Sequence, residues 1–180
     1  MKLLKYSALL ACAIVFGAAC SDDDNPAAPG PTPQPTTIVF TAQMSAANEV
    51  PPVTNAESGG RGTATITFNL TRDAAGTITA GNANFSYTLN SFPAGTVIRA
   101  SHIHEGAAGV AGGVRVDTGL SPATAVTIGG DGNGSLSFSN IAMTDIALIN
   151  SIIANPAGYY FNVHSNLNPG GVVRGQLVRQ

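Results

Sequence analysis

A two-residue alternation of apolar and small polar side chains constrains the fold of this chain more than any other feature. In TATITFNL, residues 63–70, Ala, Ile, Phe and Leu alternate with Thr and Asn, and NANFSYTL, residues 82–89, repeats the pattern. Successive side chains of a β-strand point to opposite faces of a sheet. The alternation therefore predicts strands with one packed face and one solvated face. Further candidate strands lie at residues 124–128, 135–139, 159–165 and 172–178.

Turn sequences separate the candidate strands, and a single stretch departs from their pattern. RDAAGT at 72–77 and GGDGNGS at 129–135 are typical of tight turns. In MTDIALINSIIANP, residues 143–156, isoleucines recur at helical spacing between a Thr144 cap and Pro156. We expect one short helix across an open end of the sheets. The short connections predict an all-β fold, an antiparallel Greek-key β-sandwich, with a small barrel as the alternative.

Charged residues are too few and too balanced to indicate a polyanionic partner. The chain has eight Lys and Arg, ten Asp and Glu, and a formal net charge of −2. Binding to nucleic acid depends on neutralising phosphates with clustered Lys and Arg, and the sequence shows no such cluster. We expect no nucleic-acid partner.

The N-terminus has the composition of an export signal. Residues 1–20 open with two lysines, continue with a short apolar run and end in Gly17-Ala18-Ala19-Cys20. This ending resembles a bacterial lipobox, with Gly17 at the position where Leu is usual. We therefore expect lipidation at Cys20, which would attach the protein to a membrane of the cell envelope, on the periplasmic or the cell-surface side.

A solvated tether follows the predicted lipidation site. SDDDNPAAPGPTPQPTT, residues 21–37, contains three consecutive Asp and five Pro, so we expect a disordered spacer. The folded domain is predicted over residues 38–180. Neither lysine nor cysteine occurs after Cys20, so no disulfide can form within the domain.

The chain's three histidines are the strongest candidates for a chemical site. His102 and His104 are separated by one residue, so on a strand both rings project to the same side. We expect them to reach inward and, if His164 lies on a neighbouring strand, to meet it. Three neutral imidazoles with an open position suit copper or zinc. The alternative is architectural: each ring donates to a backbone carbonyl.

Polar residues near the histidines have two interpretations each. Glu105 either orients a ligating histidine or is a solvated turn residue. Asn162, on the same strand face as His164, either hydrogen-bonds near the site or satisfies a strand end. Arg174 either guides an anion or pairs with Glu49 or Glu105 and fixes a loop. No carboxylate pair, Ser-His-Asp arrangement or reactive cysteine competes with the histidines.

Four motifs give the chain a resemblance to a known family. NEVPP at 48–52, HIHEG at 102–106, YYFNVHS at 159–165 and NPGGVVRGQL at 168–177 occur in the order of the CHRD domain, first named in chordin. The resemblance covers the whole predicted domain. In chordin these domains accompany separate cysteine-rich modules that bind growth factors. This chain has no such module, so a growth-factor role is not implied.

HIHEG is also similar to the His-Val-His-Glu segment of copper/zinc superoxide dismutases, which are Greek-key sandwiches. That similarity implies copper ligation by His102, His104 and His164, with Arg174 guiding an anion. The histidine that bridges copper to zinc, the zinc ligands and the disulfide of the dismutases have no counterpart here. The similarity therefore favours a copper-type site over dismutation.

Three function classes follow from the sequence. We expect an exported, lipid-anchored binding or structural module of the bacterial cell envelope, whose histidines are architectural or hold a metal, copper before zinc. The alternative is a copper redox protein of superoxide dismutase-like design, the only enzymatic activity that the sequence suggests. A third class is an adhesion or matrix module that binds a protein or glycan through its Thr/Asn-rich face.

Overall fold

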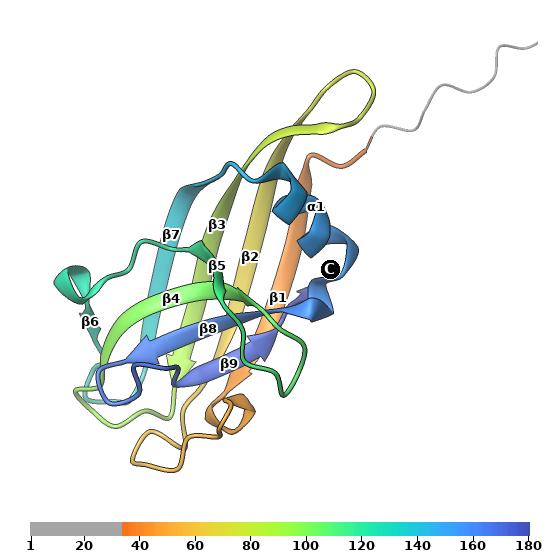
Figure 1. Cartoon of the computed structure of the whole chain (residues 1–180). Helices are drawn as coiled ribbons and strands as arrows, with labels where there is room; N and C mark the ends of the chain where they lie inside the picture. The colour runs from red at the N-terminus through yellow and green to blue at the C-terminus, as the bar shows by residue number, and fades with distance from the viewer. Residues whose placement is uncertain (1–33) are drawn as a thin grey trace, which may run out of the picture. The chain divides into compact units, whose positions relative to one another are not determined.

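The computed structural model describes residues 34–180, which form ten strands, one α-helix and three 3-10 helices (Figure 1). The predicted signal peptide, the lipidation site and most of the tether lie outside these residues. Among the helices that the structure describes, none has the length and apolarity needed to span a membrane. In chain order the elements are β1 (Thr37–Ser45), η1 (Ala46–Asn48), β2 (Arg61–Arg72), β3 (Ile78–Asn90), β4 (Val97–Glu105), β5 (Val114–Asp117), η2 (Pro122–Thr124), β6 (Val126–Thr127), β7 (Gly134–Met143), α1 (Ile146–Ala154), η3 (Pro156–Gly158), β8 (Tyr159–Ser165), β9 (Val173–Gln176) and β10 (Val178–Arg179).

The strands form one antiparallel sheet that folds over on itself. Its order is β5-β4-β8-β9-β1-β2-β3-β7, with β10 paired to β1 and β6 paired to β4. The sheet bends so that β4, β8 and β9 cross over β1, β2, β3 and β7, and it is nearly barrel-shaped (Figure 1). The prediction of an all-β antiparallel fold with one short helix is confirmed. The two layers of the predicted sandwich are joined through the β9–β1 pair.

The core lies between the two layers and follows the alternation of the sequence. On β2 the apolar side chains are buried and the intervening threonines are exposed or half-buried. On β3, Phe85 is buried opposite Ile66 of β2. Phe85 also stacks on Phe161 of β8, with ring centroids 5.7 Å apart, and Tyr87 packs edge-on against the same ring at 5.2 Å. These aromatic contacts fix the two layers against each other.

The helix begins later than the sequence suggested. Met143 is the last residue of β7, and α1 starts at Ile146 with Asp145 as its N-cap, whose side chain accepts a hydrogen bond from the Leu148 amide at 2.9 Å. The cap is therefore Asp145 and not Thr144. Ile149 is fully buried and lies against Gly81 of β3, where a Cβ would come within 2.9 Å of its Cδ1. Because Gly81 has no side chain, the helix can pack against this end of the sheet.

Candidate metal centre

Strands β4 and β8 bring the three histidines together. They pair antiparallel with Ala100 opposite His164 and His102 opposite Asn162, so His102 and His164 are diagonal neighbours. His102 Nδ1 lies 3.1 Å from His164 Nε2. The ring centroids are 4.9 Å apart for His102 and His164, 5.4 Å for His102 and His104, and 5.6 Å for His104 and His164. One nitrogen from each ring lies within 4.8 Å of the other two.

The rings lie on the face of the sheet opposite the apolar core, which corrects our expectation that they reach inward. Ile103 and Phe161 point into the core and are fully buried. The histidines occupy the alternate positions. Two loops contact them, residues 106–113 through the Gly112 carbonyl and residues 166–172 through the Pro169 carbonyl. Even so, the side chain of His102 is only 15% exposed, and the other two histidines are buried. The site is thus enclosed by loops and not by the second layer.

Hydrogen bonds at the outer nitrogens orient two of the rings. His104 Nδ1 lies 3.0 Å from the Gly112 carbonyl, and His164 Nδ1 lies 3.1 Å from the Pro169 carbonyl. A carbonyl only accepts, so both Nδ1 atoms bear the hydrogen and both Nε2 atoms present lone pairs to the site. His104 Nε2 is buried and has no hydrogen-bond partner among the described residues. Holding the outer nitrogen of an imidazole in this way is how proteins orient metal-ligating histidines.

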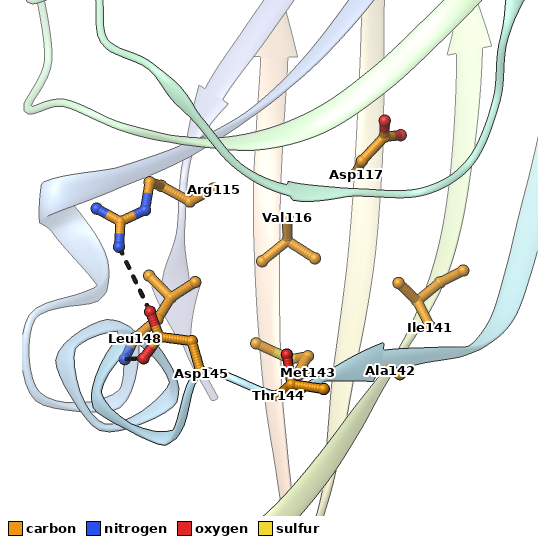
Figure 2. A pocket seen from close by; sticks show the side chains of 9 residues that line it. All are labelled: Arg115, Val116, Asp117, Ile141, Ala142, Met143, Thr144, Asp145 and Leu148. Carbon is orange, nitrogen blue, oxygen red and sulfur yellow. Dashed lines mark hydrogen bonds and ion pairs between the residues drawn. The ribbon is translucent and has the colours of Figure 1, made fainter.

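A carboxylate that the sequence analysis did not consider faces the third ring. Asp117 of β5 lies opposite His102 of β4, and its Oδ1 is 3.7 Å from His102 Nε2. Glu105, the predicted orienting residue, is exposed and pairs with Arg115 instead. Figure 2 shows the Asp117 carboxylate pointing away from Val116, which faces the pocket between β5 and the β7–α1 junction. No local motif indicates Asp117, because it reaches His102 only through the β4–β5 pairing.

Burial keeps the three imidazoles neutral near pH 7. It lowers the pKa of His164 to about 4, with a further contribution from the neighbouring His102. Burial also lowers the pKa of His102 and of His104 below the ordinary value. A metal ligand must be deprotonated, so at neutral pH no imidazolium has to lose a proton before a metal binds.

Aromatic stacking connects the site to a buried cation. His104 stacks on Tyr160 with centroids 4.9 Å apart and an interplanar angle of 10°. The guanidinium carbon of Arg174 lies 3.5 Å from the centroid of the same Tyr160 ring. Arg174 is 2% exposed, and its Nη2 donates to the Ala107 carbonyl at 2.9 Å and to Gln176 at 3.2 Å. Arg174 thus holds the 106–113 loop through the Ala107 carbonyl, and not through Glu49 or Glu105.

The expected ion pairs of Arg174 do not form among the described residues. Glu105 is paired with Arg115. Glu49 forms no ion pair with Arg174 at an N–O distance of 4.0 Å or less, although the charge of Arg174 influences its carboxyl. Burial raises the pKa of Glu49 to about 7, against the opposing effects of Arg174 and of a hydrogen bond to Asn162. Asn162 is buried on the strand face of His164, and its Oδ1 has no hydrogen-bond partner in this part of the chain.

Comparison with known proteins gives one match. A family model described as the CHRD domain matches residues 40–177, which include all three histidines. The search of curated proteins and the search of solved structures both returned no match.

Proposed function

The chain belongs to the CHRD domain family, and from this premise we propose that the domain is an exported module that holds one metal ion between His102, His104 and His164. The observation behind the proposal is the convergence of three imidazole nitrogens within 4.8 Å of one another. His104 and His164 have an unprotonated Nε2 in the site. His102 Nδ1 donates to His164 Nε2 in the metal-free protein, and it would ligate a metal in the tautomer that carries the hydrogen on Nε2, which faces Asp117.

The donor set determines which metals fit. His104 Nε2 is a buried polar atom with no partner among residues 34–180, and a buried group of this kind is costly unless something satisfies it. Three neutral nitrogens suit copper or zinc, and they lack the oxygen ligands that calcium and magnesium prefer. Such an ion would supply Lewis acidity, or one-electron chemistry if it is copper, while the chain's own residues orient the rings and exclude water.

A simple metal-holding module is favoured over a dismutase-like redox protein. Among the described residues, the three histidines are the one group whose geometry can hold a metal. The dismutase similarity includes a second, bridged metal, for which these residues offer no ligands. The adhesive alternative would use the threonine face of β2, which carries no aromatic side chain.

We place the module in the cell envelope, attached to a membrane through a lipid on Cys20. The support is the sequence: an apolar leader ends in a lipobox-like segment, and an Asp- and Pro-rich tether follows. The first described strand, β1, begins at Thr37, the last residue of the predicted tether. Radiolabelled palmitate incorporation, lost in Cys20→Ser, tests this attachment.

Metal content tests the proposed site directly. We expect full-length protein purified without chelators to contain close to one equivalent of copper or zinc, and metal at 100 times its Kd to stabilise the fold by about 2.7 kcal/mol. The triple variant His102→Ala/His104→Ala/His164→Ala should lose both effects. Thr63→Ala/Thr65→Ala/Thr67→Ala, which removes three polar side chains from one face of β2, is the matched control and should keep them. Wild-type protein that neither contains metal nor is stabilised by it would contradict the proposal.

A further inference from the structure

The charges around the three histidines point to a specific ion, and we propose that the site is built to hold monovalent copper in preference to divalent copper or zinc. This inference rests on the proposed function, because it assumes that the histidines bind a metal. It goes beyond that proposal by specifying the charge of the bound metal ion.

The ligands themselves bring no negative charge to the metal. All three donors are neutral imidazoles, so the ion keeps its full charge inside the protein. The cost of burying an ion rises with the square of its charge, and a dication without anionic ligands is therefore much more costly to bury than a monocation. His104 and His164 are 7% and 6% exposed, so water does little to offset this difference.

Two arginines add positive charge beside the site. Arg174 is 2% exposed and is connected to His104 through the Tyr160 ring, with stacking distances of 3.5 and 4.9 Å. Arg99, on the same strand as His102 and His104, lies within electrostatic reach of His164. Each guanidinium repels a divalent ion more strongly than a monovalent ion.

Two carboxyl groups oppose the arginines, but less effectively. Asp117 faces His102 at 3.7 Å, yet its side chain is 59% exposed, and solvent screens an exposed charge far more than a buried one. Glu49 is buried, but its pKa of about 7 means that it is only partly ionised at neutral pH. Of these four charged groups, Arg174 is the permanent charge that burial shields most from solvent, and it acts on His104.

The coordination geometry agrees with the electrostatics. Monovalent copper is satisfied by two or three nitrogen ligands, whereas zinc held by three histidines takes a water or another ligand in its fourth position. The chain supplies three, and the loops of residues 106–113 and 166–172 lie over the rings that they anchor through Gly112 and Pro169. A divalent ion would need a fourth ligand in this covered space.

Competition with chelators measures the preference. Under anaerobic, ascorbate-reduced conditions, bathocuproine disulfonate reports the Cu(I) affinity of the full-length protein, and separate competitions with chelators for divalent ions report the affinities for Cu(II) and Zn(II). We expect Cu(I) to bind at least a hundredfold more tightly than either divalent ion.

Charge variants test whether the surrounding field sets this preference. A unit charge at ~10 Å with an effective dielectric of ~20 alters the ratio of Cu(I) to Cu(II) affinity by roughly tenfold. Arg174→Met should lower that ratio by about this factor, and Arg174→Lys should restore most of it. Asp117→Asn should raise the ratio. Arg179→Met, on β10, removes the same charge from a strand that pairs with β1 and should change nothing.

The outcomes separate the two proposals. If no ion binds, the proposed function fails and this inference fails with it. If Cu(II) or Zn(II) binds as tightly as Cu(I), the inference alone is wrong and the metal site stands. Should Arg174→Met fail to fold, as judged by circular dichroism, Arg99→Met and Asp117→Asn test the same field from less buried positions. Shifts of the affinity ratio in the same direction for both would overturn the electrostatic explanation.

Discussion

At the residue scale, two buried groups beside the site respond to pH in opposite directions. Burial raises the pKa of Glu49 to about 7, whereas in the unfolded chain it ionises near 4.5. The folded state holds the Glu49 proton more tightly than the unfolded state does. The stability that this proton contributes is therefore lost as pH rises from 4.5 to 7. His164, with a pKa of about 4, is protonated more readily in the unfolded chain, near 6.5. Its contribution is lost as pH falls from 6.5 to 4.

Glu49→Gln separates these effects in metal-free protein. Gln resembles the protonated carboxyl, so we expect the variant to gain stability relative to wild type between pH 4.5 and 7, by about 3 kcal/mol at the upper end. With Glu49 removed, the free energy of unfolding should rise with pH from 4 to 6.5, as His164 requires. Urea unfolding at a series of pH values measures both. A difference between variant and wild type that does not change with pH would contradict the assignment.

At the scale of elements, the connection between β4 and β5 covers the site and fixes one of its rings. The Gly112 carbonyl lies 3.0 Å from His104 Nδ1, and the Gly112 amide donates to the Tyr160 hydroxyl at 3.1 Å. A Cβ on Gly112 would lie 1.5 Å from the Glu105 carbonyl oxygen. Only glycine therefore fits, because the loop passes directly over the end of its own strand.

A pair of glycine substitutions tests the function of this loop. Gly112→Ala must displace the loop, so we expect a loss of about 1–3 kcal/mol of stability and at least a tenfold loss of metal affinity, because His104 loses its orienting carbonyl. A Cβ on the neighbouring Gly113 meets nothing within 4 Å, so Gly113→Ala should change neither quantity appreciably. Thermal unfolding and chelator competition measure them. Equal affinity in the two variants would show that the loop does not orient the ring.

At the scale of the whole molecule, the strand that contributes His164 also packs against the other layer. Phe161 of β8 is fully buried and contacts Phe85 and Tyr87 of β3, while His164 lies on the opposite face of the same strand. One face of β8 thus packs against the other layer, and its opposite face places a candidate metal ligand.

Phe161→Ala should destabilise the domain by about 3–5 kcal/mol, because it leaves a cavity between the layers. We expect the folded fraction to keep its metal stoichiometry, since the substitution does not touch the histidine face. Phe138→Ala, at a half-buried position of the edge strand β7, is the control and should cost less. Chemical denaturation and metal analysis of the folded fraction report the two effects. A loss of metal without a loss of stability would contradict the separation of faces.

Local structure follows from the pattern of residues along the chain. The period-two pattern of residues 63–70 and 82–89 predicted which side chains face the core, because a strand alternates its faces without regard to its neighbours. Isoleucines at helical spacing likewise predicted α1. The spacing of His102 and His104 placed both on one face of a strand for the same reason.

Tertiary structure decided what surrounds the histidines. His164 meets His102 from 62 residues away because β8 pairs with β4, and no local pattern specifies that pairing. Asp117 took the place predicted for Glu105, and Arg174 stacked on Tyr160 in place of an ion pair, through contacts between separate strands. The sequence also could not tell the core face from the loop-covered face for the histidines. Which strand face packs into the core depends on the apolar side chains of the opposite layer, and the two layers meet only when the sheet folds over on itself.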